Sequence, residues 1–283
     1  MPKPTPFRPA QARPLTRHVQ MLERAALALR MQQFADAEQC AVEILRANRT
    51  DAGAISILAH ALIAQSRAAE AIPHLEKAVR RSDDPSLQTL LGAALGGAGR
   101  SAEAIDRLRQ VAMRRPPFAP AFQELANQLS LAGQNDDAVV VIEEALALLS
   151  GLIELELVLA RLHMARNMRA KARAIFERAR ATAPGRTDIM IELARIMMSD
   201  GEYAAASDLY RHALGLNPND ALTRAELATC LLEMGEREAG ETALRKAVHG
   251  RPQLLGRAAY ALAVSSHGRF FFRPSALEKF LRA

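Results

Sequence analysis

Residues 191–220 read IELARIMMSDGEYAAASDLYRHALGLNPND, and this stretch predicts two short helices joined by a tight turn. Apolar residues recur at helical spacing on both sides of Gly201, and glycine readily adopts the left-handed conformation that ends a helix. Ala206 and Ala213 lie two helical turns apart in the second segment, and Pro218 follows where that helix should end. The small side chains at Ala206 and Ala213 let two helix backbones approach each other closely.

The same pattern recurs along most of the chain. Glycine precedes the position of Ala206 by five residues in four units, and proline follows it by twelve residues in four units. A helix pair this short cannot bury its own apolar face, so neighbouring pairs must stack into an all-α solenoid. The spacing of the small anchor residue is 34 five times and 33 once, at Ala37, Ala71, Ala104, Ala138, Ala172, Ala206 and Gly240.

This pattern resembles the tetratricopeptide repeat family, whose consensus places Leu-Gly or Leu-Ala in the first helix, Gly at the turn, Ala and an aromatic residue in the second helix, and then Pro. The opening Trp of that motif is absent, and Arg49, Asp83 and Ser150 stand where proline is expected. The resemblance implies an α-solenoid of seven helix-turn-helix repeats that form a right-handed superhelix. In the quoted unit the matching residues are Leu193, Ala194, Gly201, Tyr203, Ala206, Tyr210, Ala213 and Pro218.

The repeat phase divides the chain into three parts. Residues 1–17 are expected to form a flexible tail rich in Pro and Arg, and residues 253–283 a pair of C-terminal capping helices. Residues 18–252 hold the seven repeats. Their expected bounds are about 18–51, 52–84, 85–118, 119–152, 153–186, 187–220 and 221–252.

Composition favours a soluble cytoplasmic protein. Apolar residues make up 49% of the 283 residues and aromatic residues only 4%, so the core must be built largely from small and aliphatic side chains. Cys40 and Cys230 are too few for a disulfide scaffold and too far apart for a zinc-ligand spacing. The longest uncharged stretches run 15 residues, whereas a bilayer span needs roughly 20 apolar residues.

The sequence offers no motif for catalysis or for a cofactor or metal. The seven histidines form no H-E-x-x-H pair, and no G-x-S-x-G turn is present. The glycine-rich stretch GAALGGAGRS lacks the first glycine and the lysine of a phosphate-binding loop, because Ala94 and Arg100 occupy those positions. We therefore expect a protein that is not an enzyme and binds no cofactor.

In tetratricopeptide repeats the first helices line a concave groove, so one stripe of those helices is expected to bind the partner. Arg161 and Arg195 stand in neighbouring repeats and could together hold a carboxylate, while methionine adapts to irregular apolar partners. The clamp that some family members use for a C-terminal carboxylate is not reproduced, because Gln123 precedes Asn127 where lysine would be required. The expected partner-binding residues are His60, Gln123, Asn127, Leu157, Arg161, Met164, Ile191, Arg195, Met198 and Thr229.

The C-terminal stretch is expected to cover the open end of the array. At least two of Phe270, Phe271 and Phe272 should pack against Tyr260 and the last repeat, which leaves one for docking to a partner. Phe280 should belong to the apolar face of a last helix. The sequence S-A-L-E at residues 275–278 predicts a capping box at the start of that helix.

These features favour an adaptor or scaffold that binds a peptide or amphipathic helix carrying an acidic residue. The alternative is a regulatory subunit or detached module of an enzyme system for polysaccharide, sulfate or glycosyl transfer, because such repeats often accompany those enzymes in this family. RNA binding gains from the pI of 9.8. The distribution of charge disfavours it, because RNA binding usually requires basic residues along the length of the chain. Here residues 1–30 and 245–283 together have a net charge of +12, and the residues between them have a net charge of −6. The partner, the oligomeric state and occupation of the groove by the chain's own ends stay open.

Overall fold

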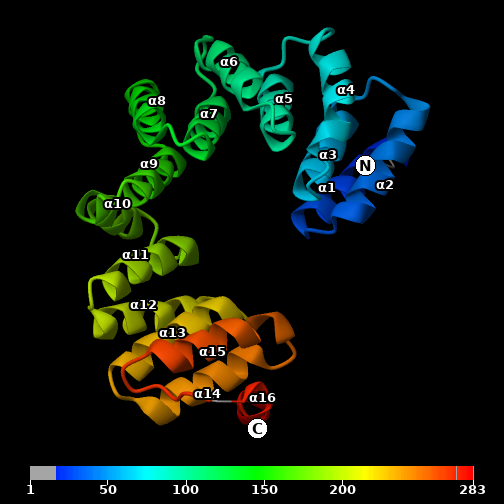
Figure 1. Cartoon of the computed structure of the whole chain (residues 1–283). Helices are drawn as coiled ribbons and strands as arrows, with labels where there is room; N and C mark the ends of the chain where they lie inside the picture. The colour runs from blue at the N-terminus through cyan, green and yellow to red at the C-terminus, as the bar shows by residue number, and fades with distance from the viewer. Residues whose placement is uncertain (1–16, 272, 283) are drawn as a thin grey trace, which may run out of the picture. The chain divides into compact units, whose positions relative to one another are not determined.

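The computed structural model describes residues 17–271 and 273–282, and every regular element within them is a helix (Figure 1). The fold is therefore all-α, which confirms the class that the repeats predict. Within the same residues, none of the helices has the length and apolar character that a membrane crossing requires. The tail prolines at positions 2, 4, 6, 9 and 14 lie outside the described residues, as does Phe272.

Seven helix pairs follow one another along the described chain. After the last pair come a 3₁₀ turn (Pro252–Leu254), α15 (Leu255–Val264) and α16 (Pro274–Arg282). The pairs are α1 (Arg17–Arg30) with α2 (Phe34–Ala47), α3 (Ala52–Ala64) with α4 (Ala68–Val79), α5 (Pro85–Gly97) with α6 (Ser101–Ala112), α7 (Ala119–Leu131) with α8 (Asn135–Leu148), α9 (Ile153–Ala165) with α10 (Arg169–Thr182), α11 (Thr187–Ser199) with α12 (Tyr203–Leu216), and α13 (Ala221–Glu233) with α14 (Arg237–Val248).

The turn inside each of the seven pairs has the same backbone geometry. One residue, five positions before the anchor, adopts a left-handed conformation, and the next amide donates to the carbonyl five residues back at 2.8–2.9 Å. Glycine fills this position in four turns, with φ between 76° and 83°. The other three turns use Gln32, Ser66 and Asn167, at φ of 58°, 61° and 55°.

The anchor residues lie where the two helices of a pair pack together. All six anchor alanines have 0% of their surface exposed. Gly240 stands in the seventh pair, where a Cβ atom would lie 2.8 Å from Cγ of Leu232 and 3.1 Å from the carbonyl oxygen of Ala228. The departure from alanine at this position therefore has a steric reason, since α13 and α14 leave no room for a methyl group.

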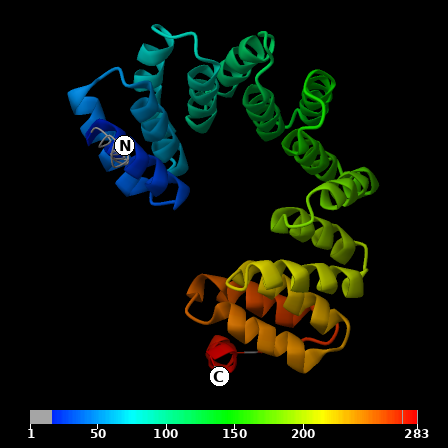
Figure 2. The same ribbon diagram turned by 180° about the vertical axis from the view of Figure 1, so that it is seen from behind.

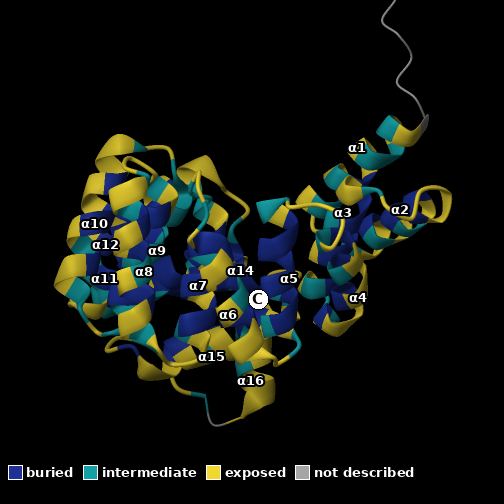
Figure 3. Cartoon of the chain, turned by 90° about the horizontal axis from the view of Figure 1, so that it is seen from above, coloured by how far each residue is buried: buried dark blue, intermediate teal, exposed yellow. Residues whose placement is uncertain are grey.

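The chain divides into two compact units that adjoin in the sequence at Ser150 and Gly151. In the first unit, residues of α2, α3, α4 and α5 share a core with Ala104 of α6. In the second unit, one core joins residues of α9 to α13, and another joins α13 and α14 to α15 and α16. Figure 3 shows these buried residues on the helix faces that point toward other helices, with exposed residues on the outside.

The last two helices cover the end of the second unit. Figures 1 and 2 show α16 at the edge of the group formed by α13, α14 and α15. Leu281 of α16 is 2% exposed, and Leu277 and Phe280 pack against the same core. The predicted capping box is wrong, because α16 begins at Pro274 and Glu278 forms an ion pair with Arg282.

Candidate functional site

Arg161 and Arg195, the two arginines predicted to hold a partner's carboxylate, occupy different environments in the second unit. Arg161 on α9 is exposed, and among the described residues no carboxylate forms an ion pair with it. On α11, Nε of Arg195 lies 3.0 and 3.2 Å from the two carboxylate oxygens of Glu226, and Nη2 lies 3.0 Å from Oε1. Arg195 therefore bonds to Glu226 within the chain, whereas Arg161 does not, and the contact of both arginines with a partner's carboxylate stays a prediction.

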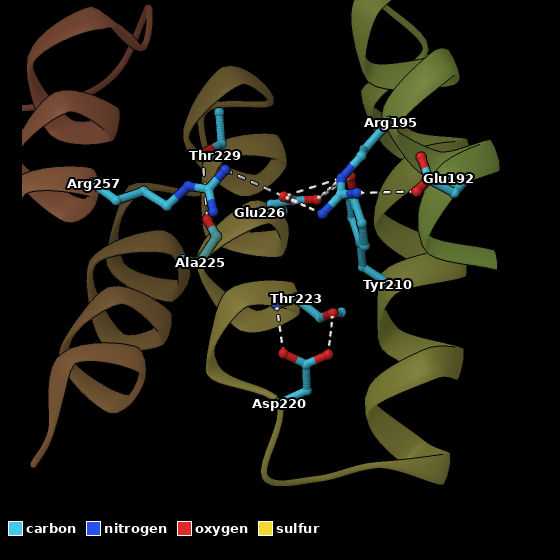
Figure 4. A network of polar contacts seen from close by, with 9 residues as sticks. All are labelled: Glu192, Arg195, Tyr210, Asp220, Thr223, Ala225, Glu226, Thr229 and Arg257. Atoms are coloured by element: carbon cyan, nitrogen blue, oxygen red, sulfur yellow. Dashed lines mark hydrogen bonds and ion pairs between the residues drawn. The ribbon is translucent and has the colours of Figure 1, made fainter. Parts of the chain in front are cut away.

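Glu226 is the centre of a polar network between α11, α12, α13 and α15 (Figure 4). Glu226 is 6% exposed, and the hydroxyl of Tyr210 donates to Oε2 at 2.9 Å. Nη2 of Arg257 lies 3.5 Å from Oε1 on the other side of the carboxylate, and Nη1 of Arg195 lies 3.4 Å from Glu192. A buried carboxylate is costly unless cations and donors surround it, so these partners serve the fold.

The charge of Glu226 also affects two neutral groups beside it. Burial raises the pKa of Tyr210, and the negative charge and hydrogen bond of Glu226 raise it further. Burial, with a further contribution from Glu226, raises the pKa of Cys230 to about 12. The Cys230 thiol is therefore protonated at neutral pH, and it lacks the thiolate character that a nucleophile or metal ligand needs.

The apolar residues predicted for the groove lie at different depths. Leu157 is 1% exposed and belongs to the core of the second unit, so its predicted contact with a partner is wrong. Its helix carries apolar residues on more than one side, and the side that holds Leu157 faces the core. Met164, Ile191 and Met198 are half-buried at the border of the same core.

The polar residues predicted for the groove are divided between the two units. In the first unit, His60 is exposed with Nδ1 2.8 Å from the carbonyl oxygen of Ser56, and Gln123 is half-buried. Asn127 is exposed and donates to Glu124 at 3.5 Å. In the second unit, the hydroxyl of Thr229 donates to the carbonyl of its own helix at 3.3 Å.

The phenylalanines at the C-terminus take separate roles. Phe271 is half-buried with its ring centroid 5.0 Å from that of Phe280, whereas Phe270 is 65% exposed. Tyr260 is 69% exposed, so the expected packing of phenylalanines against it is wrong. The position of Phe272 is outside the described residues.

Arginines surround a second buried carboxylate beside this aromatic pair. Glu241 is 5% exposed, and Nε of Arg269 lies 3.0 Å from its Oε1. Nε of Arg237 and Nη2 of Arg245 lie 3.6 Å from its two oxygens. The guanidinium groups of Arg245 and Arg269 also stack over the Phe280 ring, at 4.6 and 5.2 Å from its centroid. Carboxylate and ring together fix these arginines to the end of the second unit.

Sequence reasoning missed both buried glutamates. Glu226 lies 31 residues after Arg195, close to the repeat length of 34, so a partner one repeat away was a signal that could have found it. Across the described part of the chain, no group of three His, Cys, Asp or Glu side chains could hold a metal ion.

Comparison with known proteins places the chain in one family. Family models described as tetratricopeptide repeat match residues 22–86, and residues 129–189 and 197–264. No protein with a curated description matches the sequence.

Solved structures show the same fold. The thermophilic tetratricopeptide repeat protein TTC0263 of Thermus thermophilus is 21% identical with a TM-score of 0.57, over 64% of this chain and 99% of that chain. A tetratricopeptide repeat protein of Parabacteroides merdae is 12% identical with a TM-score of 0.57, over 94% of this chain and 97% of that chain. One chain of the Cut9–Hcn1 hetero-tetramer of the APC/C is 17% identical with a TM-score of 0.60, over 93% of this chain and 55% of that chain. With its repeat phase, its helix pairs and these matches, the chain belongs to the tetratricopeptide repeat family.

Proposed function

We propose that this protein is a non-catalytic adaptor that binds a segment of another protein on the first-helix face of its second unit. The tetratricopeptide fold is in general a protein-interaction module, which supports a protein as the partner. The face is made by Arg161 and Met164 on α9 and by Ile191 and Met198 on α11. Residues three or seven positions apart lie on the same side of a helix, so each helix presents its pair together.

Arg161 is the observation that carries this proposal. It is an exposed cation without an ion pair among the described residues, and Met164 next to it is half-buried. Arginine binds carboxylates by two parallel hydrogen bonds, and methionine packs against irregular apolar side chains. The matching partner is a peptide or amphipathic helix that has an apolar anchor beside an acidic residue.

Arg195 contributes to this face in a different way from Arg161. Its guanidinium bonds to Glu226 and Glu192, so it shapes the surface without offering a free charge. Reversing its charge would leave Glu226 buried without its main partner, and the protein would lose stability along with any binding. Of these two arginines, a change at Arg161 alone should therefore weaken binding without lowering stability.

The test uses the full chain with Arg161→Glu and a matched variant, Arg178→Glu, which reverses an exposed charge on α10. Each protein is immobilised to capture partners from a lysate of the source cells, and the captured proteins are then measured individually for affinity. We expect one protein to bind the wild type and Arg178→Glu, and to bind Arg161→Glu at least about tenfold more weakly at equal melting temperature. Equal binding to all three would contradict the proposal, and selective loss of RNA would favour a nucleic-acid partner.

A further inference from the structure

A large hollow on the first unit lies away from the stripe that carries His60. It is a cleft of about 1050 Å³ between the C-terminal halves of α2 and α4, with residues from the beginnings of α3 and α5. Leu45, Ile55, Leu58 and Leu87 form its apolar floor, and each is at most 9% exposed. This volume is at the upper end of the roughly 300–1,000 Å³ that is typical of ligand sites in proteins.

The rim of this cleft is positively charged. It carries Arg46, Arg49, His74, Lys77 and Arg81, all of them exposed, and no Asp or Glu lines the cleft. Within the described residues, none of these five side chains forms an ion pair or a hydrogen bond. We call this site, floor and rim together, the basic cleft.

The acidic residues in the loops after α2 and α4 are held by other partners. Asp51 accepts the Ala54 amide at 2.8 Å and lies 3.0 Å from Nε2 of His18. Asp83 pairs with Arg114 at 2.8 Å, and Asp84 accepts the Ser86 amide at 2.8 Å. The charge of the basic cleft is therefore not neutralised from the neighbouring loops.

Helix ends explain only part of this charge. Arg46 and Lys77 stand in the last turns of α2 and α4, where a cation interacts favourably with the helix dipole. Arg49 and Arg81 lie in the loops after these helices, two residues beyond the last helical residue, where the interaction with the dipole is weaker. Four cations around one apolar floor repel each other, and a bound anion would relieve this repulsion.

A matching cleft in the second unit shows that the repeat fold by itself does not require a basic rim. It has about 420 Å³, and its lining includes Leu214, Leu227, Ala243 and Lys246, which correspond in the repeat phase to Leu45, Leu58, His74 and Lys77. Arg224 also lines it, at the position of Ile55. The positions equivalent to Arg46, Arg49 and Arg81 are occupied there by Gly215, Pro218 and Gly250, and Glu238 adds an acid to the lining.

We infer that the basic cleft binds an acidic amphipathic segment of another protein. Aliphatic side chains of the segment would cover the floor, and its carboxylates would pair with Arg46, Arg49 and Arg81 by charge-assisted hydrogen bonds. This site is separate from the one proposed around Arg161, since it lies in the other unit and on second helices.

Charge and lining select this occupant over the others. The chain's own ends do not fit, because residues 1–30 and 245–283 together carry a net charge of +12. A single-stranded nucleic acid would bind through aromatic stacking, and the cleft is lined by no aromatic residue other than His74. An acidic peptide with aliphatic side chains complements both the rim and the floor.

The test is a fluorescence-anisotropy titration of the full chain with a labelled peptide of about 20 residues, which has Leu at i, i+3, i+4 and i+7 and Glu elsewhere. We expect binding that weakens with added salt and falls at least about tenfold in the double variant Arg49→Glu with Arg81→Glu. The matched variant Lys246→Glu should bind like the wild type. The double variant should cause the same fold loss when it is made in an Arg161→Glu background, which keeps this result independent of the proposed function. Circular dichroism should show unchanged helicity, and Arg49→Gln with Arg81→Gln replaces the double reversal if that variant unfolds.

Several results would overturn the inference. Equal binding by the double variant would place the peptide elsewhere, and equal binding of an analogue with Gln for Glu would remove the role of charge. Equal binding of oligoglutamate would remove the role of the floor. Tighter binding of a single-stranded RNA, lost in the same double variant, would assign the cleft to nucleic acid. Self-association that depends on Arg49 and Arg81 would assign it to a second copy of the chain.

Discussion

The two units use positive charge in opposite ways. In the first unit, Arg46, Arg49 and Arg81 surround the basic cleft without ion pairs among the described residues. In the second unit, arginines converge on Glu226 and Glu241, which are 6% and 5% exposed. The same residue type is thus available for recognition around the basic cleft and required for folding around Glu226 and Glu241.

This difference determines what a charge change should do in each unit. An exposed cation in high dielectric contributes little to stability, whereas the only strong partner of a buried carboxylate contributes several kcal/mol. The first unit also has ion pairs, such as Arg67 with Glu38 at 2.8 Å, but both residues are only half-buried. Recognition and stability should therefore respond to different arginines, and the following predictions test that separation.

The largest effect is expected from Arg195→Ala. This change leaves Glu226 buried with only Tyr210 and the more distant Arg257, so the free energy of unfolding should fall by roughly 3 kcal/mol. Urea denaturation followed by circular dichroism measures this loss. Arg49→Ala in the basic cleft is the control, with a change within about 0.5 kcal/mol. Equal losses in the two variants would remove the distinction between the units.

Ala206→Leu should lower the free energy of unfolding by about 1–3 kcal/mol, because the anchor is 0% exposed and the pair interface has no space for a larger side chain. Tyr210 lies one helical turn later, so the overpacked variant should also disturb its hydrogen bond to Glu226. Ala205→Leu changes an exposed neighbour on the same helix and should be nearly neutral. A neutral result at both positions would mean that the pair interface adapts to a larger residue.

Alkaline pH should destabilise the second unit through Cys230 and Tyr210. Both groups have a higher pKa in the folded state than in the unfolded state. Their contribution to the free energy of unfolding is therefore fully present below the unfolded pKa and is lost as the pH rises toward the folded pKa. For Cys230 the loss should run from about pH 9 to pH 12, at about 1 kcal/mol per pH unit near its middle. Urea unfolding at pH 8 and pH 10 measures the loss, and Cys230→Ala should reduce it. The same slope in that variant would contradict this origin.

The smallest effect is expected at the left-handed turns. Asn167→Gly should raise the free energy of unfolding by a few tenths of a kcal/mol, and Ser66→Gly by up to about 1 kcal/mol, since serine is less tolerant of positive φ. Thermal melting of both variants measures the gain. Ser66 lies in the first unit and Asn167 in the second, so the pair shows whether the turns contribute alike in both. Destabilisation by either glycine would mean that chain entropy outweighs the relief of strain.

The fold could be predicted because its determinants are local. Each anchor, turn residue and helix end depends on neighbours within one repeat, and the recurrence of the pattern compensates for weak single units. At Gln32 the residue type alone does not predict a turn, yet the backbone there has the same left-handed geometry as at the glycine turns. The seven-fold phase identifies this turn even though glycine is absent from it.

The candidate site could be predicted only in part, because its chemistry depends on contacts between repeats. Arg161 and Arg195 occupy the same repeat position, and no local feature of the sequence distinguishes the free arginine from the one bound to Glu226. Leu157 was misplaced because its helix carries apolar residues on several sides. The basic cleft was missed because its cations come from two repeats and gather only when α2 and α4 pack over α3.

Lys77 and Lys246 occupy the same repeat position in the basic cleft and in the matching cleft, and they belong to a small set of primary amines. Only five of the 37 basic residues are lysines. Amine-reactive crosslinkers modify lysine and leave arginine unmodified, so each cleft offers them a single attachment point. Crosslinking mass spectrometry would therefore record a partner in either cleft at one defined residue, while most of the positive surface of the protein would give no signal.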